Sequence, residues 1–269
     1  MKKSRSPRKD GEYINSLARG LSVLRAFTRR RPELTLSEVA TATRLSPAVA
    51  RRCLNTLFHL GYVGKQGRLF LLRPEVMAFA SAYLESMNLE EIARPFLQVV
   101  RDRTGDSSSL TVLAHHDILY LMHVSTNRRI RLAAGVGTRF PAYATSMGRV
   151  LLAHQSKEIR EHYLHTAELK PLTDKTVTSI TRLRAILNKA RRDGYASVQD
   201  ELDYGIVSVA VPVLNDTGEV IAAINCSTST TRIHQRDMIE SRLPVLREAA
   251  KSIELEVRRY PVLSHSVTP

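Results

Sequence analysis

Residues 34–70 of this 269-residue chain are LTLSEVATATRLSPAVARRCLNTLFHLGYVGKQGRLF. Thr35 and Glu38 have the spacing of a capping box, in which two side chains satisfy the first N–H groups of a helix. Ser46 is a favourable N-cap, and Pro47 follows at the first helical position, where its missing N–H costs nothing. The stretch therefore predicts two helices joined by a tight break.

A hairpin follows the second helix, which Gly61 should end. Residues 62–72 contain two short β-prone runs around a glycine-containing turn. An apolar pattern with helical spacing at 14–29 precedes the pair of helices. Three helices and a hairpin are the layout of a winged helix-turn-helix, here at about 14–74 with the helix-turn-helix itself at about 35–60. In that fold the second helix of the pair enters the major groove of DNA.

The second predicted helix has two distinct faces. Its apolar face should pack on the other helices and carries Ala50, Cys53, Leu54 and Leu57. On the other face, Arg can donate a bidentate pair of hydrogen bonds to guanine, and Asn can do the same to adenine. The candidate DNA-binding residues are Thr35, Ser46, Ala48, Val49, Arg51, Arg52 and Asn55, with Lys65 and Arg68 at the hairpin tip. The alternative is a three-helix interaction domain with solvated arginines.

Basic charge is concentrated in the first quarter of the chain. Lys and Arg number 40 against 26 Asp and Glu, which gives a net charge of +14. Residues 1–76 hold 16 basic and 5 acidic residues, whereas residues 77–269 hold 24 and 21. A basic block before a nearly balanced body indicates a module that binds an anion such as double-stranded DNA. The alternative is a solubilising basic tail, since residues 2–9 alone contribute five charges.

Length and composition favour two globular domains, and the cysteine pattern favours a reducing cytoplasm. Hydrophobic residues make up 43% of the chain and charged residues 25%, which is ordinary for a protein with a packed core. No uncharged stretch approaches the roughly 18–20 residues of a membrane span. The basic start has no apolar run behind it, so it does not resemble a signal peptide. Cys53 and Cys226 form no CxxC pair.

The rest of the chain predicts an α+β domain, with helices flanking a mainly antiparallel sheet. Strands are expected at 107–114, 118–126, 129–134, 206–214 and 219–227, and helices at 144–153, 156–165, 179–193 and 235–259. Asn88 and Glu91 form a second candidate capping box, and Pro244 should kink or break the last helix. The predicted divisions are a basic tail at 1–13, the DNA-binding domain at 14–74, a linker helix at 75–88, a second domain at 89–259 and a tail at 260–269.

Several separate stretches resemble the IclR family of bacterial transcriptional regulators. They are residues 14–24, 36–40, 52–63, 140–153 (FPAYATSMGRVLLA), 205–212 and 218–227, so the resemblance covers about 14–259. Within the family, GTRFPAY at 137–143 looks most like the regulators of protocatechuate and β-ketoadipate catabolism.

The resemblance implies a GAF-like α/β effector-binding domain, a homodimer or tetramer, and a small inducer that is often a carboxylate. The subgroup leans towards activation, which would make RNA polymerase a partner. Ser146 and Met147 match the place where the family's ligand meets a helix N-terminus, whose free N–H groups suit a carboxylate. The candidate effector-binding residues implied by the family are Arg139, Ser146, Met147, Asp200, Ser208, Asn225 and Ser227.

Two of these positions depart from the family pattern and leave the identity of the ligand open. Many relatives carry Cys where this chain has Ser208, and Ser where it has Asn225. The other candidates have structural alternatives. Ser227 is then an ordinary strand residue, Asp200 a solvated loop charge, and Arg139 the partner of a neighbouring acid rather than of a second ligand carboxylate.

No motif favours an enzyme. His115-His116-Asp117 invites a metal site, but it lies where turn residues are expected and lacks a third ligand at suitable spacing. The chain has no GxSxG, HExxH or P-loop pattern, and Gly135-Val136-Gly137 lacks the rest of a dinucleotide fingerprint. We therefore expect a cytoplasmic regulator without cofactor, metal or membrane contact. A small-molecule-binding enzyme with a basic appendage is the more distant alternative.

Overall fold

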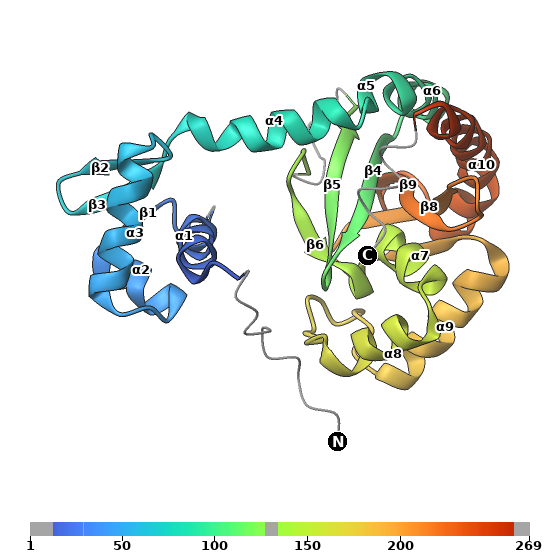
Figure 1. Ribbon diagram of the computed structural model, residues 1–269. Helices are drawn as coiled ribbons and strands as arrows, with labels where there is room; N and C mark the ends of the chain where they lie inside the picture. The colour runs from blue at the N-terminus through green and yellow to red at the C-terminus, as the bar shows by residue number, and fades with distance from the viewer. Residues whose placement is uncertain (1–12, 29, 127–133, 261–269) are drawn as a thin grey trace. The chain divides into compact units, whose positions relative to one another are not determined.

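The computed structural model describes residues 13–28, 30–126 and 134–260. The chain divides into two compact units between Tyr83 and Leu84 (Figure 1). No helix in these described ranges is long and apolar enough to cross a membrane.

The described part of the N-terminal unit combines helices with a small antiparallel sheet in the strand order β1-β3-β2. Its elements are α1 (Asn15–Ala26), β1 (Glu33–Thr35), α2 (Leu36–Thr43), α3 (Pro47–His59), β2 (Val63–Gln66), β3 (Leu69–Leu72), the 3-10 turn η1 (Pro74–Val76) and the first part of α4 (Met77–Ser86). The helices and the β2–β3 hairpin confirm the predicted winged helix-turn-helix.

Both predicted helix starts are present in this unit. The hydroxyl of Thr35 accepts the backbone N–H of Glu38, and the Glu38 carboxylate accepts the backbone N–H of Thr35 at 2.7 Å. That second hydrogen bond is the main reason why the pKa of Glu38 lies below its ordinary value. Ser46 accepts the N–H of Val49 at 3.4 Å, with Pro47 in the first turn of α3. Local side-chain chemistry therefore fixes where α2 and α3 begin.

α1 turns its most apolar row away from the core of its own unit. The side chains of Ile14, Leu17 and Leu21 are 62%, 60% and 48% exposed. Val23 and Phe27 are instead the buried residues that pack with α2 and α3. The helical spacing of the stripe predicts the helix correctly, but the stripe leaves an apolar surface open to solvent.

The described part of the C-terminal unit contains a six-stranded antiparallel sheet in the order β6-β5-β4-β9-β8-β7, together with helices (Figure 1). Its elements, besides the end of α4, are α5 (Leu89–Ile92), α6 (Arg94–Thr104), β4 (Ser107–Ala114), β5 (Asp117–Val124), β6 (Arg139–Pro141), the 3-10 turn η2 (Ala142–Ala144), α7 (Ser146–His154), α8 (Lys157–Thr166), α9 (Ile180–Asp193), β7 (Ala196–Gln199), β8 (Ile206–Leu214), β9 (Val220–Ser229) and α10 (Gln235–Arg259). The result confirms the α+β class.

The alternation of side chains gives this sheet two different faces. On one face, the thiol of Cys226 lies 3.6 Å from the Thr104 hydroxyl on α6, and α10 packs on the same layer. On the other face, the hydroxyl of Thr111 lies 3.3 Å from the sulfur of Met147 on α7. The neighbours of Cys226 on β9, Asn225 and Ser227, therefore face α7.

Three sequence predictions need correction or fall outside the described residues. Asn88 has φ +49° and its side chain makes no capping hydrogen bond, so the second capping box is wrong. α10 continues through Pro244, so the break is wrong as well, because the apolar face of this helix stays packed on the unit's core on both sides of the proline. Of the strand expected at 129–134, all but the last residue lies outside the described residues.

Close approach of two backbones places the start of α7. A Cβ at Gly148 would lie only 2.2 Å from the carbonyl oxygen of Ala142, which is far inside van der Waals contact. The 3-10 turn η2 therefore lies directly on the first turn of α7, and only glycine leaves room for it.

We predict that Gly148→Ala destabilises the C-terminal unit by about 1–3 kcal/mol, because the methyl group has to displace backbone rather than a flexible side chain. Gly20→Ala is the matched control, since a Cβ there meets nothing within 4 Å. In the middle of α1 it should stabilise the N-terminal unit by roughly 0.5–1 kcal/mol. Denaturant unfolding followed by circular dichroism measures both. Equal shifts of the same sign would contradict the close-contact explanation.

Candidate DNA-binding surface and effector pocket

α3 separates its packing residues from its predicted base-reading residues. The packing side consists of Ala50, Leu54 and Leu57, all buried in the core of the N-terminal unit. The exposed side carries Ala48, Arg51, Arg52 and Asn55. A helix with one side held in a core and the other free presents small, cationic and amide side chains as a major groove requires.

The other predicted DNA contacts are the two helix caps, Thr35 and Ser46, and two residues of the hairpin that follows α3. The hydroxyls of Thr35 and Ser46 are engaged as helix caps. Lys65 and Arg68 are exposed around the β2–β3 turn, where Gly67 has φ +58°. The ammonium of Lys65 lies 5.8 Å from the centre of the Phe70 ring, so its position is partly fixed by a cation–π contact.

A groove of about 660 Å³ runs between α1 and α3 in this unit. Leu17, Leu21 and Leu24 line it from α1, and Val49 and Arg52 line it from α3. Val49 is half-buried there, so it and Arg52 face the groove as well as the predicted DNA-binding side. The exposed apolar row of α1 and this groove form one continuous apolar surface.

In the C-terminal unit, the first turn of α7 faces a buried pocket of about 20 Å³. Thr145 is the N-cap, and its hydroxyl accepts the N–H of Gly148 at 3.0 Å. The N–H groups of Ser146 and Met147 precede the first intrahelical hydrogen bond and so have no acceptor within the helix. Free N–H groups and the positive end of the helix dipole favour an anion at this place.

The pocket brings together most of the effector-site residues expected from the sequence. Its lining includes five of the seven: Ser146, Met147, Ser208, Asn225 and Ser227. The hydroxyls of Ser146 and Ser208 lie 2.9 Å apart, which links the start of α7 to β8. Ser208 in turn is the register partner of Ser227 on β9. These side chains converge although they are up to 81 positions apart in the chain.

Arg139 and Asp200 are not in this lining. The guanidinium of Arg139 is exposed and donates to the carbonyl of Ala114 at 3.3 Å. The Asp200 carboxylate accepts from the Lys175 ammonium at 2.9 Å and from the Gly205 N–H at 2.7 Å. The hydrogen bond from Lys175 is the largest cause that holds the pKa of Asp200 below its ordinary value. In this structure Asp200 therefore holds a loop together.

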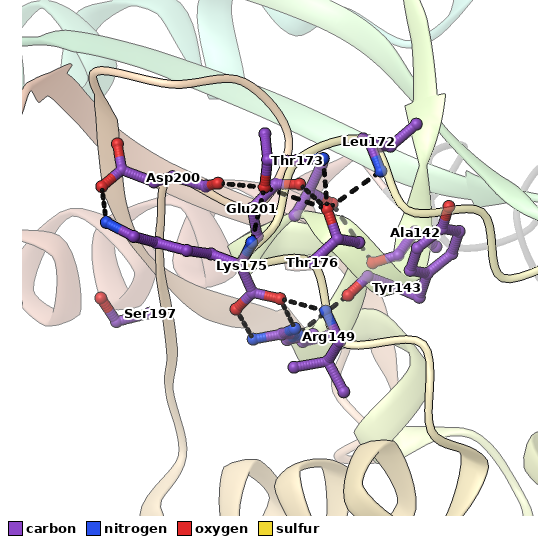
Figure 2. A network of polar contacts seen from close by, with 12 residues as sticks. Ala142, Tyr143, Arg149, Leu172, Thr173, Lys175, Thr176, Ser197, Asp200 and Glu201 are labelled. Atoms are coloured by element: carbon purple, nitrogen blue, oxygen red, sulfur yellow. Dashed lines mark hydrogen bonds and ion pairs between the residues drawn. The ribbon is translucent and has the colours of Figure 1, made fainter.

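That loop, residues 200–205, is anchored by a buried ion pair (Figure 2). Arg149 on α7 donates two hydrogen bonds to the Glu201 carboxylate, one of them at 2.7 Å, and a third to the carbonyl of Tyr143 at 2.9 Å. Both charged side chains are almost inaccessible, at 3% and 11% exposed. Thr176 adds a hydrogen bond from its hydroxyl to the Glu201 carbonyl at 2.6 Å. The network fixes the loop against the helix that carries the pocket's N–H groups.

Sequence reasoning missed the apolar half of the pocket. Its remaining lining residues are Tyr120, Ala144, Thr145, Val198, Leu202 and Ile206. The Thr145-Ser146 pair before an apolar run is a recognisable cap signal for the start of α7. No local sequence pattern predicts Tyr120 or Leu202 as pocket residues. Tyr120 reaches the pocket through the pairing of strands, and Leu202 reaches it through the loop 200–205. Burial raises the pKa of Tyr120, so its phenol stays neutral.

Within the described ranges, no group of three His, Cys, Asp or Glu side chains could hold a metal ion. His115 has φ +61° and lies in the turn between β4 and β5.

Comparison with known proteins shows what this combination of parts is. The model for the IclR helix-turn-helix domain matches residues 16–67, and that for the bacterial transcriptional regulator IclR C-terminal domain matches residues 81–255. The Pca regulon regulatory protein of Pseudomonas putida is 37% identical over 91% of this chain and 84% of its own length. The p-hydroxybenzoate hydroxylase transcriptional activator of Acinetobacter baylyi is 35% identical over 90% and 91%.

A solved structure agrees over the same length. An IclR homolog from Microbacterium hydrocarbonoxydans, complexed with 4-hydroxybenzoate, is 28% identical and superposes with a TM-score of 0.76 over 91% of this chain and 100% of its own. The capped helix pair, the hairpin, the effector-type domain and these full-length matches lead to one conclusion: the chain belongs to the IclR family of DNA-binding transcriptional regulators and is not an enzyme.

Proposed function

We propose that this regulator senses a small aromatic carboxylate, an intermediate of protocatechuate or β-ketoadipate catabolism, and activates transcription in response. One observation carries the proposal: five predicted effector residues line a buried pocket at the first turn of α7, where the N–H groups of Ser146 and Met147 have no acceptor within the helix. The two curated relatives described above regulate the pca regulon and p-hydroxybenzoate hydroxylase, and the solved homolog holds 4-hydroxybenzoate. The competing proposal is a repressor that responds to another organic acid.

We assign DNA binding to 14–74, the linker to 75–88 and effector binding to 89–259. The tails at 1–13 and 260–269 lie almost entirely outside the described residues. Thr35, Ser46, Ala48, Val49, Arg51, Arg52, Asn55, Lys65 and Arg68 are the proposed DNA contacts. Operator DNA, the inducer, a second copy of the chain and RNA polymerase are the proposed partners, in the cytoplasm.

The pocket has to enlarge before such an effector fits. A volume of about 20 Å³ holds a water molecule but not a benzene ring. Leu202 belongs to the loop 200–205, whereas most of the lining comes from α7 and the sheet. We therefore propose that ligand binding moves Leu202 while the Arg149–Glu201 pair keeps the start of the loop in place, which would allow the effector to change the conformation of the protein.

The first prediction from the proposed function concerns operator recognition. Arg51→Ala and Arg52→Ala should weaken specific binding by roughly 1–3 kcal/mol where the side chain reads a base, whereas Lys65→Ala should weaken binding to all sequences alike. Arg236→Ala is the charge-matched control, because Arg236 is exposed on α10 and paired with Glu240. Titration of operator and unrelated duplexes measures both effects. Normal operator affinity in both arginine variants would remove α3 as the recognition helix.

The second prediction concerns assembly through the apolar surface of α1. Two copies joined there would present two recognition helices, so the operator should be a near-palindrome with half-sites separated by helical turns. Leu21→Glu places a charge on this surface at a side chain that is already 48% exposed, so the fold should survive while self-association weakens. Leu172→Glu, at an exposed leucine of the other unit, is the control. Sedimentation and footprinting that match wild type for Leu21→Glu would place the interface elsewhere.

The third prediction concerns the carboxylate. Ser146→Val removes a hydroxyl beside the free N–H groups of α7, and a hydrogen bond to a charged group contributes roughly 1.5–3 kcal/mol. The variant should still bind operator DNA but need about ten to a hundred times more inducer in a reporter dose–response. The primary amide of the same inducer is the matched control, because it lacks the charge. An unchanged dose–response would move the carboxylate site away from α7.

A further inference from the structure

Asn225 carries a buried acceptor that the protein leaves unused. Its side chain is 4% exposed and lines the effector pocket. The amide oxygen Oδ1 is buried and has no hydrogen-bond partner among the described residues. Buried polar atoms in folded proteins are nearly always paired, and an unpaired one carries a desolvation cost. The hydrogen-bond donor for Oδ1 of Asn225 therefore has to come from outside the chain.

The nearby hydroxyl groups are already engaged with other atoms. Those of Ser146 and Ser208 pair with each other at 2.9 Å. Ser109, the register partner of Asn225 on β4, lies 2.9 Å from Nδ1 of His123. Thr111 is directed at the sulfur of Met147. None of these contacts involves Oδ1 of Asn225.

The acceptor lines the same pocket as the first turn of α7 and lies along β9 from the side chains that meet it. Ser227 is the register partner of Ser208, whose hydroxyl meets Ser146 at the start of α7. Asn225 is two residues farther along β9, which is about 6.7 Å at the rise of an antiparallel strand. The pocket's apolar lining includes Tyr120, a wall suited to an aromatic ring.

We propose that Asn225 recognises a hydroxyl group on the effector, accepting its O–H at Oδ1, and thereby selects hydroxylated aromatic acids over aliphatic dicarboxylates. This inference rests on the proposed function, since it assumes that the carboxylate binds at α7. A second carboxylate offers only acceptors, and two acceptors facing each other repel. A phenol offers a donor and stays protonated in a buried place, as Tyr120 does in the same pocket.

The test compares three probes on the full-length protein by calorimetry: benzoate, 4-hydroxybenzoate and adipate. Wild type should bind 4-hydroxybenzoate about ten times more tightly than benzoate or better, and adipate more weakly than either. Asn225→Leu should reduce the preference for 4-hydroxybenzoate over benzoate to less than about threefold. Asn225→Asp keeps an acceptor at the same place and removes the amide donor, so it should retain the preference and bind adipate still more weakly.

Each other result has a defined meaning. If wild type binds neither aromatic acid, the proposed function fails together with this inference. If wild type binds benzoate and 4-hydroxybenzoate equally, or if Asn225→Leu keeps the preference, the aromatic effector stands and the role of Asn225 is overturned. If Asn225→Asp loses the preference while Asn225→Leu also loses it, the amide donates rather than accepts, and the inference is again overturned. Should the leucine variant fail to fold, the isosteric aspartate variant still decides.

Discussion

The buried pair of Arg149 and Glu201 connects the parts of the effector domain that matter for ligand binding. Its guanidinium holds the Glu201 carboxylate and the carbonyl of Tyr143, and the same carboxylate accepts the N–H of Val177 at 3.1 Å. One ion pair thus joins α7, the turn before it, the loop 200–205 and the segment near 177 (Figure 2). Removing one partner of such a pair leaves a buried charge uncompensated, at a cost of about 3–5 kcal/mol. The pocket's shape depends on this constraint, because Leu202 follows Glu201 directly.

The sheet face beneath α7 is unusually polar for a buried layer. Ser109, Thr111, Ser208 and Asn225 are all less than 9% exposed on it, where valine or leucine would pack at lower cost. The three hydroxyl groups have partners on β5 or α7, namely His123, Met147 and Ser146, and the Asn225 amide oxygen is the exception. Hydroxyl and amide groups around the end of a helix reduce the apolar area that the core buries. In exchange, they can form hydrogen bonds with an anion that has left water. This is a physical reason to regard the pocket as a ligand site rather than a packing defect.

The sequence predicts the N-terminal unit far better than the effector pocket, and the reason is the range of the interactions. Thr35, Glu38, Ser46 and Pro47 act within one helical turn, so their spacing alone places α2 and α3. The pocket is assembled by pairing between strands that are more than a hundred positions apart in the chain, and no local pattern reveals such pairing. The family resemblance predicted Ser208 and Asn225 as site residues. Neither periodicity nor spacing predicted Leu202. Asn88 shows the opposite failure, since a local capping pattern was overridden by the chain's left-handed turn there. The apolar stripe of α1 has the spacing of a helix, but this spacing does not show whether the stripe faces the core of its own unit or stays exposed.

A pocket too small for its expected ligand also explains how binding can regulate. An effector that fitted a preformed cavity equally well in every state would change no equilibrium, however tightly it bound. The proposed aromatic effector needs space that the lining, Leu202 included, does not leave, so under this proposal the liganded and unliganded domains differ. In the proposed mechanism α7 would supply the charge recognition, while Leu202, which follows the anchored Glu201, would supply the difference between states. An allosteric coupling of about 1–3 kcal/mol, typical for ligand-controlled proteins, needs only part of the ligand's binding energy to be used in moving that loop. Under this proposal the basic charge of the N-terminal unit stays constant, and the switch would reside in the geometry of an almost neutral domain.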